Sequence, residues 1–325
     1  MIGFRFGQDD LLRTRFAIAP LMELVGCLYA LRDPVRVAVH RPWAEWARPR
    51  TGHLDLSLLE VATPSGRPFY PVFIGPPPRT PNATVAAELE RVRSTPAKRV
   101  AAEIARAYPE GVPAAGRILV EDPALGLERL VAQMRNLWDA ALAPWWERLL
   151  SVLESEIAWR ARRLATVGPR AAFTGLHESV SWRDGLLRID PTTKAPADID
   201  LAGRGLLLVP AAFTWPNVWP RTDPPWDPAL VYPPAGVADL WAPDERDDGA
   251  LEALLGRRRA RILLELARPA STLDLSNRID ASPGGVSEHL GVLRRGGLVV
   301  GHREGRRVIY ARTARGDDLA RGSGG

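Results

Sequence analysis

The first 170 residues of the chain show apolar residues at helical spacing. Pro20 suits a first helical position, and the apolar residues after it form one helical face: Leu21, Leu24, Val25 and Leu28. Residues 83–107 predict a helix that Pro96 bends or divides. The strongest periodicity lies in two later runs, the first made of Leu127, Leu130, Val131, Met134, Leu137 and Trp138 and the second, after Pro144, of Trp146, Leu149, Leu150, Leu153 and Ile157. Residues 43–80 are rich in Pro, Gly and Trp without a period, which predicts loop or extended chain.

The period of the pattern changes from helix to strand after residue 175. Residues 180–189 alternate around Asp184-Gly185, a dipeptide that favours a tight hairpin turn. Short apolar runs at 206–209 and 230–232 predict further strands. This part of the chain is therefore expected to be a Trp-rich α+β domain.

A boundary is expected near residue 245, because residues 243–249 are polar and acidic without periodicity. All 11 tryptophans precede this segment. From residue 251 onward there are 14 Arg and 8 Asp plus Glu, a net charge of +6, and since the whole chain carries +5, residues 1–250 carry −1. We expect a mixed domain over residues 1–242, a linker over 243–250 and a basic domain over 251–325, whose charge favours a polyanionic partner.

The basic domain begins with the pattern of two helices. A first helix is expected over residues 251–267, ended by Pro269. Ser271 and Asp274 resemble a capping box, with Asp in place of the usual Glu, and predict a short second helix that runs to Ile279.

A third helix and a hairpin complete the domain. Ser282 is a good N-cap and Pro283 a good first residue, and the helix ends at Gly296-Gly297 after an apolar face made of Val286, Leu290 and Leu293. Strands at residues 298–300 and 308–310 are expected to pair across a tight turn. This order of elements is that of a winged helix-turn-helix.

The residues that the third helix leaves facing solvent suit contact with double-stranded DNA. Short side chains near its N-terminus let a helix enter the major groove deeply, and hydroxyls, a helix N-terminus and arginines bind phosphate oxygens and base edges. The residues expected to contact DNA on the third helix and the wing are Ser282, Gly284, Gly285, Ser287, Glu288, His289, Arg294, Arg295, Arg303, Arg306 and Arg307. Such contacts predict an affinity that falls steeply with salt.

Two motifs in residues 251–315 carry a family resemblance. S-x-H-L-x-x-L-x-x-x-G-L-V begins at Ser287, and G-R-x-x-x-Y ends at Tyr310. Together they resemble the ArsR class of winged-helix repressors. The preceding residues resemble an uncharacterised domain found before such modules in actinobacterial regulators, on the patterns of residues 10–16, Pro20 and residues 143–146.

The resemblance implies a repressor that binds inverted-repeat operators as a homodimer and is released by a small-molecule effector. The single cysteine, Cys27, favours a reducing cytoplasm, so a cytoplasmic, nucleoid-associated protein is expected. Metal-sensing members carry cysteines on the helix before the recognition helix, whereas residues 272–279 contain none, so thiolate metal sensing is not expected. Members usually dimerise through a helix after the wing. Only residues 316–321 remain there, so the first helix of the module or the N-terminal domain is expected to form the interface.

Other kinds of site find little support in the sequence. Cys27 is the single cysteine, the five histidines lack metal-ligand spacing, and no catalytic or nucleotide-binding motif occurs, so no metal, cofactor or enzymatic activity is expected. His177 and Glu178 are expected to lie in a loop before the hairpin rather than to act as an acid–base pair. No apolar run approaches the ~20 residues of a membrane span, so no membrane partner is expected.

The tryptophans in Pro-rich segments allow two interpretations. Their rings either line a ligand cleft or pack in the core beneath long loops, and the residues concerned are Trp43, Trp46, Trp215, Trp219 and Trp226. An enzyme with a DNA-binding tail, or an interaction scaffold whose tail contacts protein, stays open beside the regulator.

Overall fold

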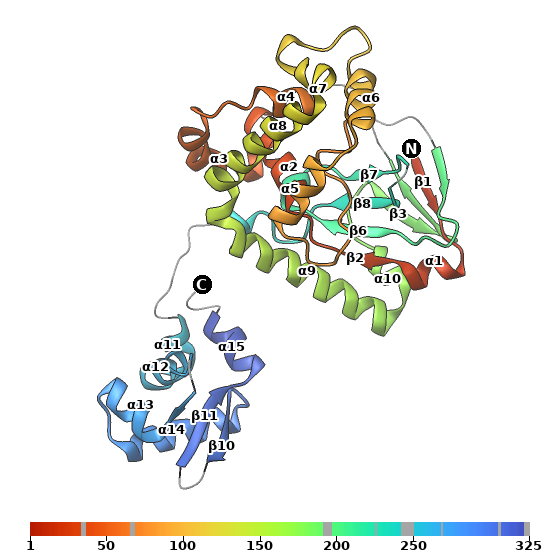
Figure 1. Ribbon diagram of the computed structural model, residues 1–325. Coiled ribbons are helices and arrows are strands. Elements are labelled where there is room, and N and C mark those ends of the chain that lie inside the picture. The colour runs from red at the N-terminus through yellow and green to blue at the C-terminus, as the bar shows by residue number, and fades with distance from the viewer. Residues whose placement is uncertain are drawn as a thin grey trace. The chain divides into compact units, whose positions relative to one another are not determined.

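The computed structural model describes residues 1–33, 37–65, 69–190, 197–224, 226–241, 250–267, 269–304 and 307–321. The chain forms two compact units, Met1–Trp241 and Ala242–Gly325 (Figure 1). Helices and strands are mixed in both, and the predicted α+β class with a C-terminal winged helix is confirmed. The predicted linker 243–250, apart from Ala250, lies outside the described residues.

The first part of the N-terminal unit is helical around α2 (Pro20–Arg32), which starts at the predicted proline. The predicted helix over 83–107 is divided as expected, into α5 (Val85–Arg93) and α6 (Ala97–Ala107) with Pro96 between them. The helices and helical turns of the rest of the unit are α1 (Gln8–Arg13), α3 (Val37–Thr51), α4 (Ser57–Ala62), η1 (Ala114–Gly116), α7 (Ile118–Glu121), α8 (Pro123–Leu137), η2 (Trp138–Leu142), η3 (Ala143–Trp145), α9 (Trp146–Val167), α10 (Pro169–Phe173), η4 (Ala212–Thr214) and η5 (Asp239–Trp241).

Two four-stranded sheets occur in the described part of this unit, with strand orders β3-β4-β1-β5 and β2-β6-β8-β7. The first contains the predicted hairpin of β3 (Val180–Arg183) and β4 (Leu186–Ile189), in which Asp184 and Gly185 both have positive φ as a type I′ turn requires. The strands of the two sheets are β1 (Ile2–Arg5), β2 (Arg15–Phe16), β5 (Ala197–Asp200), β6 (Leu207–Pro210), β7 (Trp219–Arg221) and β8 (Ala229–Tyr232), together with that hairpin.

Helix α2 is held at the centre of the unit by close packing and by a buried carboxylate. Its Gly26 lies against η4, where an added Cβ would come 2.5 Å from Cβ of Phe213. Glu23 is fully buried, and its two oxygens accept the backbone N–H groups of Ala212 and Phe213 at 2.7 and 3.0 Å. The helix and η4 are therefore fixed to each other by shape and by hydrogen bonds.

The prediction of loop over residues 43–80 is wrong for its first part, because α3 occupies residues 37–51 and α4 residues 57–62. Helix α3 contains Pro42 and Pro49, each of which costs a helix about 3 kcal/mol. Burial outweighs this cost: Trp43, Ala44 and Ala47 are fully buried, and Trp43 Nε1 donates to the carbonyl of Ala141 at 3.0 Å. Tertiary packing, rather than local propensity, forms this helix.

The C-terminal unit contains the elements of a winged helix around its own apolar core. They are α11 (Ala250–Leu255), α12 (Arg257–Glu265), β9 (Ala270–Ser271), α13 (Thr272–Ile279), α14 (Pro283–Arg295), β10 (Val299–Glu304), β11 (Arg307–Arg312) and α15 (Ala314–Arg321), with β10, β11 and β9 in one sheet. The prediction of one helix over 251–267 is wrong. Gly256 has φ +81°, a conformation that ends α11 before α12 begins.

Candidate nucleic-acid interface

Helix α13, which precedes α14, begins with a complete capping box. Ser271 Oγ accepts the backbone N–H of Asp274 at 3.2 Å, and the Asp274 carboxylate accepts the N–H of Ser271 at 3.0 Å and its hydroxyl at 2.7 Å. Leu275 and Ile279 face the core, and Asp280 adopts a left-handed conformation that ends α13. The capping residues predicted from the sequence are confirmed.

Helix α14 begins and is oriented as its sequence predicts. Ser282 Oγ accepts the N–H of Gly285 at 3.3 Å, Pro283 occupies the first turn, and the buried face consists of Val286, Leu290 and Leu293. The solvent face consequently carries the residues expected to contact DNA: Ser282, Gly284, Ser287 and Glu288 are exposed, and Gly285 and His289 are partly buried. A Cβ added at Gly284 would meet nothing within 4 Å, so this end of the helix is open to a partner.

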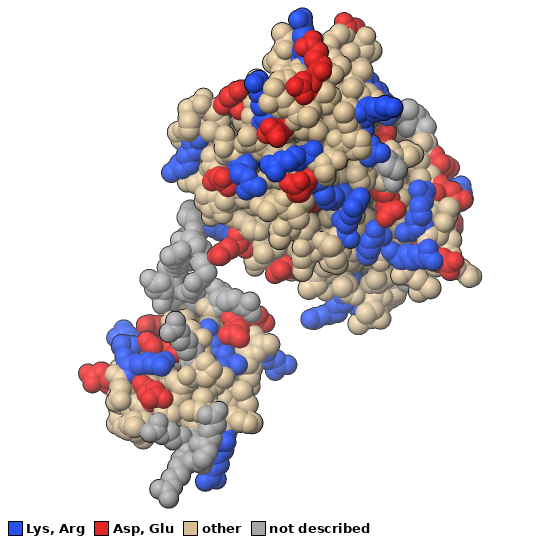
Figure 2. All heavy atoms as spheres, in the orientation of Figure 1, with Lys and Arg blue, Asp and Glu red and all other residues tan. Residues whose placement is uncertain are grey.

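Basic residues extend from the end of α14 to the wing. Arg294 and Arg295 are exposed in the last turn of α14, and Arg303 is exposed on β10 opposite Val308 of β11. Figure 2 shows basic atoms beside the wing hairpin. Arg307 is the first residue of β11, whereas Arg306 lies outside the described residues.

One arginine of the unit is turned inward and is not available to DNA. Arg312 donates to the carbonyl oxygens of Leu263 and Leu264 at 2.7 and 2.6 Å, close to the C-terminus of α12. It thereby satisfies two carbonyls that a helix end leaves without partners.

The arrangement presents a helix N-terminus, hydroxyls and arginines on one element. Backbone N–H groups and the positive end of the helix dipole attract phosphate, and Ser287 and His289 carry side chains of the kinds that form hydrogen bonds with base edges. Glu288 adds an acceptor of the kind that pairs with cytosine amino groups. The geometry is suited to the major groove of DNA.

Residues 257–302 match a family model described as a helix-turn-helix domain. These residues form an ArsR-type helix-turn-helix domain. Residues 93–238 match a family of unknown function, DUF5937. The ArsR-type domain makes the chain a DNA-binding transcription regulator.

Among solved structures, reduced HlyU from Vibrio cholerae N16961 is similar to this chain. The identity is 31%, the match covers 23% of this chain and 79% of that chain, and the TM-score is 0.20. No curated protein matches the chain. Within the described ranges, none of the helices combines the length and the apolar character that a membrane crossing requires.

Four of the five tryptophans considered as ligand residues belong to one apolar core cluster or pack against it, and Trp226 lies outside that cluster. Trp43 lies in the core; Trp46 and Trp215 are partly buried beside Trp145 and His40, and Trp219 packs on Tyr29. Trp226 lines a pocket.

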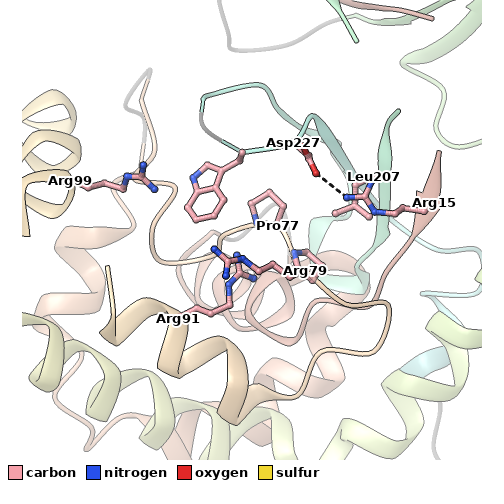
Figure 3. Close-up of a pocket in the computed structure, with 9 residues that line it drawn as sticks. Arg15, Pro77, Arg79, Arg91, Arg99, Leu207 and Asp227 are labelled. Carbon is pink, nitrogen blue, oxygen red and sulfur yellow. Dashed lines mark hydrogen bonds and ion pairs between the residues drawn. The ribbon is translucent and has the colours of Figure 1, made fainter. Parts of the chain in front are cut away.

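This pocket was not predicted from the sequence. It has a volume of about 440 Å³ and is lined by Arg15, Pro77, Pro78, Arg79, Arg91, Arg99, Leu207, Trp226 and Asp227 (Figure 3). The register of the parallel strands explains part of it, because Arg15 of β2 pairs with Leu207 of β6, and Leu207 pairs with Ala229 just after Asp227. Arg91 of α5 and Arg99 of α6 complete it. The sequence signal was weak because these residues share no local spacing.

Two further titratable residues considered as possible sites, His177 and Cys27, are in contact with other parts of the fold. His177 lies in the turn before β3, where Nδ1 is 2.7 Å from Ser179 Oγ and Nε2 is 2.9 Å from the carbonyl oxygen of Pro216. Cys27 is buried, and burial raises the pKa of its thiol. In the described part of the chain, no group of three His, Cys, Asp or Glu residues is placed to hold a metal.

Proposed function

We propose that this regulator is a cytoplasmic, nucleoid-associated repressor that binds its operator as a homodimer and carries no enzymatic activity. In this proposal residues 251–325 read DNA, residues 243–250 link the two parts, and residues 1–242 sense a small molecule or form the dimer. The observation that carries it is the N-terminal face of α14. On this face the space around Gly284 is open and Ser282 and Ser287 are exposed, while the opposite face of the helix is buried in the core of its unit.

We assign direct contact with DNA to the residues predicted from the sequence. Ser287, Glu288 and His289 read base edges, and Ser282, Gly284 and Gly285 approach the phosphates at the helix N-terminus. Arg294, Arg295, Arg303, Arg306 and Arg307 supply phosphate contacts, which fix orientation without reading sequence.

We assign the dimer interface to α11–α12 or to the N-terminal unit. Helix α15 has eight residues, and its buried Ala320 belongs to the core of its own unit, so little of it is left for a partner. A two-fold dimer requires half-sites about one or two turns of DNA apart, roughly 10–20 bp between centres.

The test is selection of binding sequences from random duplexes by the full chain, followed by gel shifts at ~150 mM salt with excess competitor. We expect an inverted repeat and a complex that survives competition. Ser287→Ala and His289→Ala should lower the affinity for the selected site more than the affinity for random DNA. Arg183→Ala, at an exposed strand end of the other unit, should change neither affinity. A single asymmetric site would refute the dimer, and loss of the complex to competitor would favour the interaction scaffold.

A further inference from the structure

The pocket of the N-terminal unit has an unbalanced charge. Its lining contains four arginines and one carboxylate, so the net charge is +3. The carboxylate, Asp227, is already paired with Arg15, whose Nη2 lies 3.0 Å from Oδ2 (Figure 3). Within the described ranges no carboxylate forms an ion pair with the other three, which are Arg79, Arg91 and Arg99.

Two carboxylates near the pocket restore the balance only in part: Glu88 interacts with the charge of Arg91, and Glu103 with that of Arg99. Both accept backbone N–H groups, although Oε1 of Glu88 accepts no hydrogen bond from a described residue. Glu88 accepts from Leu21 at 2.9 Å, and Glu103 accepts from Val72 and Phe73 at 2.6 and 3.0 Å. Burial raises the pKa of Glu88 to about 7, so its negative charge is incomplete at neutral pH. Counted with Asp227, these two carboxylates leave the four arginines of the pocket in excess by one, and partial protonation of Glu88 increases that excess.

Hydrogen-bond donors of the pocket also lack acceptors. Both terminal nitrogens of Arg91 and Nε1 of Trp226 are buried and make no hydrogen bond to any described residue. The guanidinium carbons of Arg91 and Arg99 lie 5.6 and 5.2 Å from the centroid of the Trp226 ring, which stabilises the charges but accepts none of their N–H groups.

The two central arginines also repel each other. Figure 3 shows the side chains of Arg79 and Arg91 next to one another. Burial lowers the pKa of Arg91, the charge of Glu88 opposes this, and the charge of Arg79 lowers it further. Like charges and unpaired donors are costly in a folded protein, so they are expected where an anion occupies the space between them.

We propose that this pocket binds a small organic anion whose carboxylate or phosphate group is held by Arg79, Arg91 and Arg99 and whose apolar part packs on Pro77, Pro78 and Leu207. Planar guanidinium groups suit such oxyanions because each offers two parallel N–H donors. The volume of about 440 Å³ fits a ligand of this size. That the ligand acts as the effector rests on the function proposed above, whereas its binding does not.

Calorimetric titration of the full chain with phenyl phosphate and with benzoate tests the site and separates the two kinds of oxyanion. We expect saturable binding of at least one, weakened at least tenfold by Arg91→Met and by Arg79→Met, and changed less than twofold by Arg183→Met. The control residue is exposed at the end of β3, in the other sheet. Absence of saturable binding of both probes up to ~10 mM, or equal affinity in the pocket variants and the control, would overturn the proposal.

Thermal unfolding without ligand distinguishes a ligand residue from a structural one. Tryptophan fluorescence follows this unit, because all 11 tryptophans precede residue 242. Arg91→Met should leave the melting temperature unchanged or raise it, since it removes an unpaired charge, and should abolish the rise caused by the bound probe. A lower melting temperature in probe-free buffer would show that Arg91 serves the fold and would overturn the proposal.

Gel shifts on the selected operator separate this inference from the proposed function. A probe that binds and changes operator affinity supports both the site and its effector role. A probe that binds without changing operator affinity supports the site and refutes the effector role. If Arg91→Met weakens operator binding while no probe binds the wild type, the arginines contact nucleic acid instead, and the small-molecule site is refuted.

Discussion

Substitution of Gly284 by alanine separates the DNA-binding role of α14 from its stability. The added Cβ meets nothing within 4 Å in the free protein, so no clash is introduced. Alanine exceeds glycine in helix propensity by up to about 1 kcal/mol in a helix interior, and Gly284 lies in the first turn, where we expect about half of that. The variant should therefore unfold at the same or slightly higher denaturant concentration than the wild type.

Gly284→Ala should weaken DNA binding, although it leaves the stability unchanged or slightly raises it. If the N-terminal face of α14 enters the major groove, an extra methyl group there must displace DNA or the helix. We expect the affinity for the selected operator to fall about tenfold, which corresponds to about 1.4 kcal/mol. Gly291→Ala is the matched control, because it lies about two turns further along the same helix, where its Cβ makes only ordinary contact with Arg295. It should stabilise the helix by up to about 1 kcal/mol and change the affinity less.

Two measurements on the full chain give both quantities. Unfolding of the C-terminal unit is followed by far-UV circular dichroism, after subtraction of the transition that tryptophan fluorescence assigns to the other unit. Dissociation constants come from gel shifts at fixed salt. Unchanged affinity in Gly284→Ala with improved stability would show that this face does not approach DNA. A loss of stability would show that the space around Gly284 is not open.

Three further predictions concern charge, pH and packing. Arg294→Ala should weaken binding to all DNA and reduce the salt slope by about one, whereas His289→Ala should alter sequence preference more than the slope, and equal effects of both would refute this division of roles. Burial raises the pKa of Glu23 to about 7 from an ordinary value of 4.5, so between these values the folded state holds a proton that the unfolded state has released. Glu88 of the same unit has an equally raised pKa, so each of the two should lower the stability of the N-terminal unit by roughly 3 kcal/mol as the pH rises from 4.5 to 7. Glu23→Gln should therefore remove about half of the combined slope in urea titrations followed by tryptophan fluorescence. Leu290→Ala removes a fully buried side chain from the C-terminal core and should cost about 2–5 kcal/mol in the circular dichroism transition alone, a result contradicted by an unchanged transition.

Local signals predicted the C-terminal unit well because its elements are specified by residues close together in sequence. Ser271 with Asp274, and Ser282 with Pro283, form caps within three residues of each other, and the apolar face of α14 repeats within eight residues. The one wrong boundary came from continued periodicity on both sides of Gly256, where the backbone conformation of a single residue divides the helix.

The N-terminal unit shows where local signals are insufficient. Prolines at 42 and 49 argued against a helix, yet α3 forms because Trp43 and its neighbours are buried against segments about 100 residues away. The sequence alone therefore favoured loop where long-range packing outweighs the cost of the prolines.

The sequence by itself determined the ArsR-type domain, its caps and the solvent face of its third helix, since helix periodicity fixes which side chains share a face. Only the tertiary structure assembled the arginine pocket. Arg15 and Asp227 lie 212 positions apart and meet because parallel strands bring their segments to one edge of a sheet. Arg91 and Arg99 reach the same space from two helices, so no spacing along the chain records the charge that they bring together.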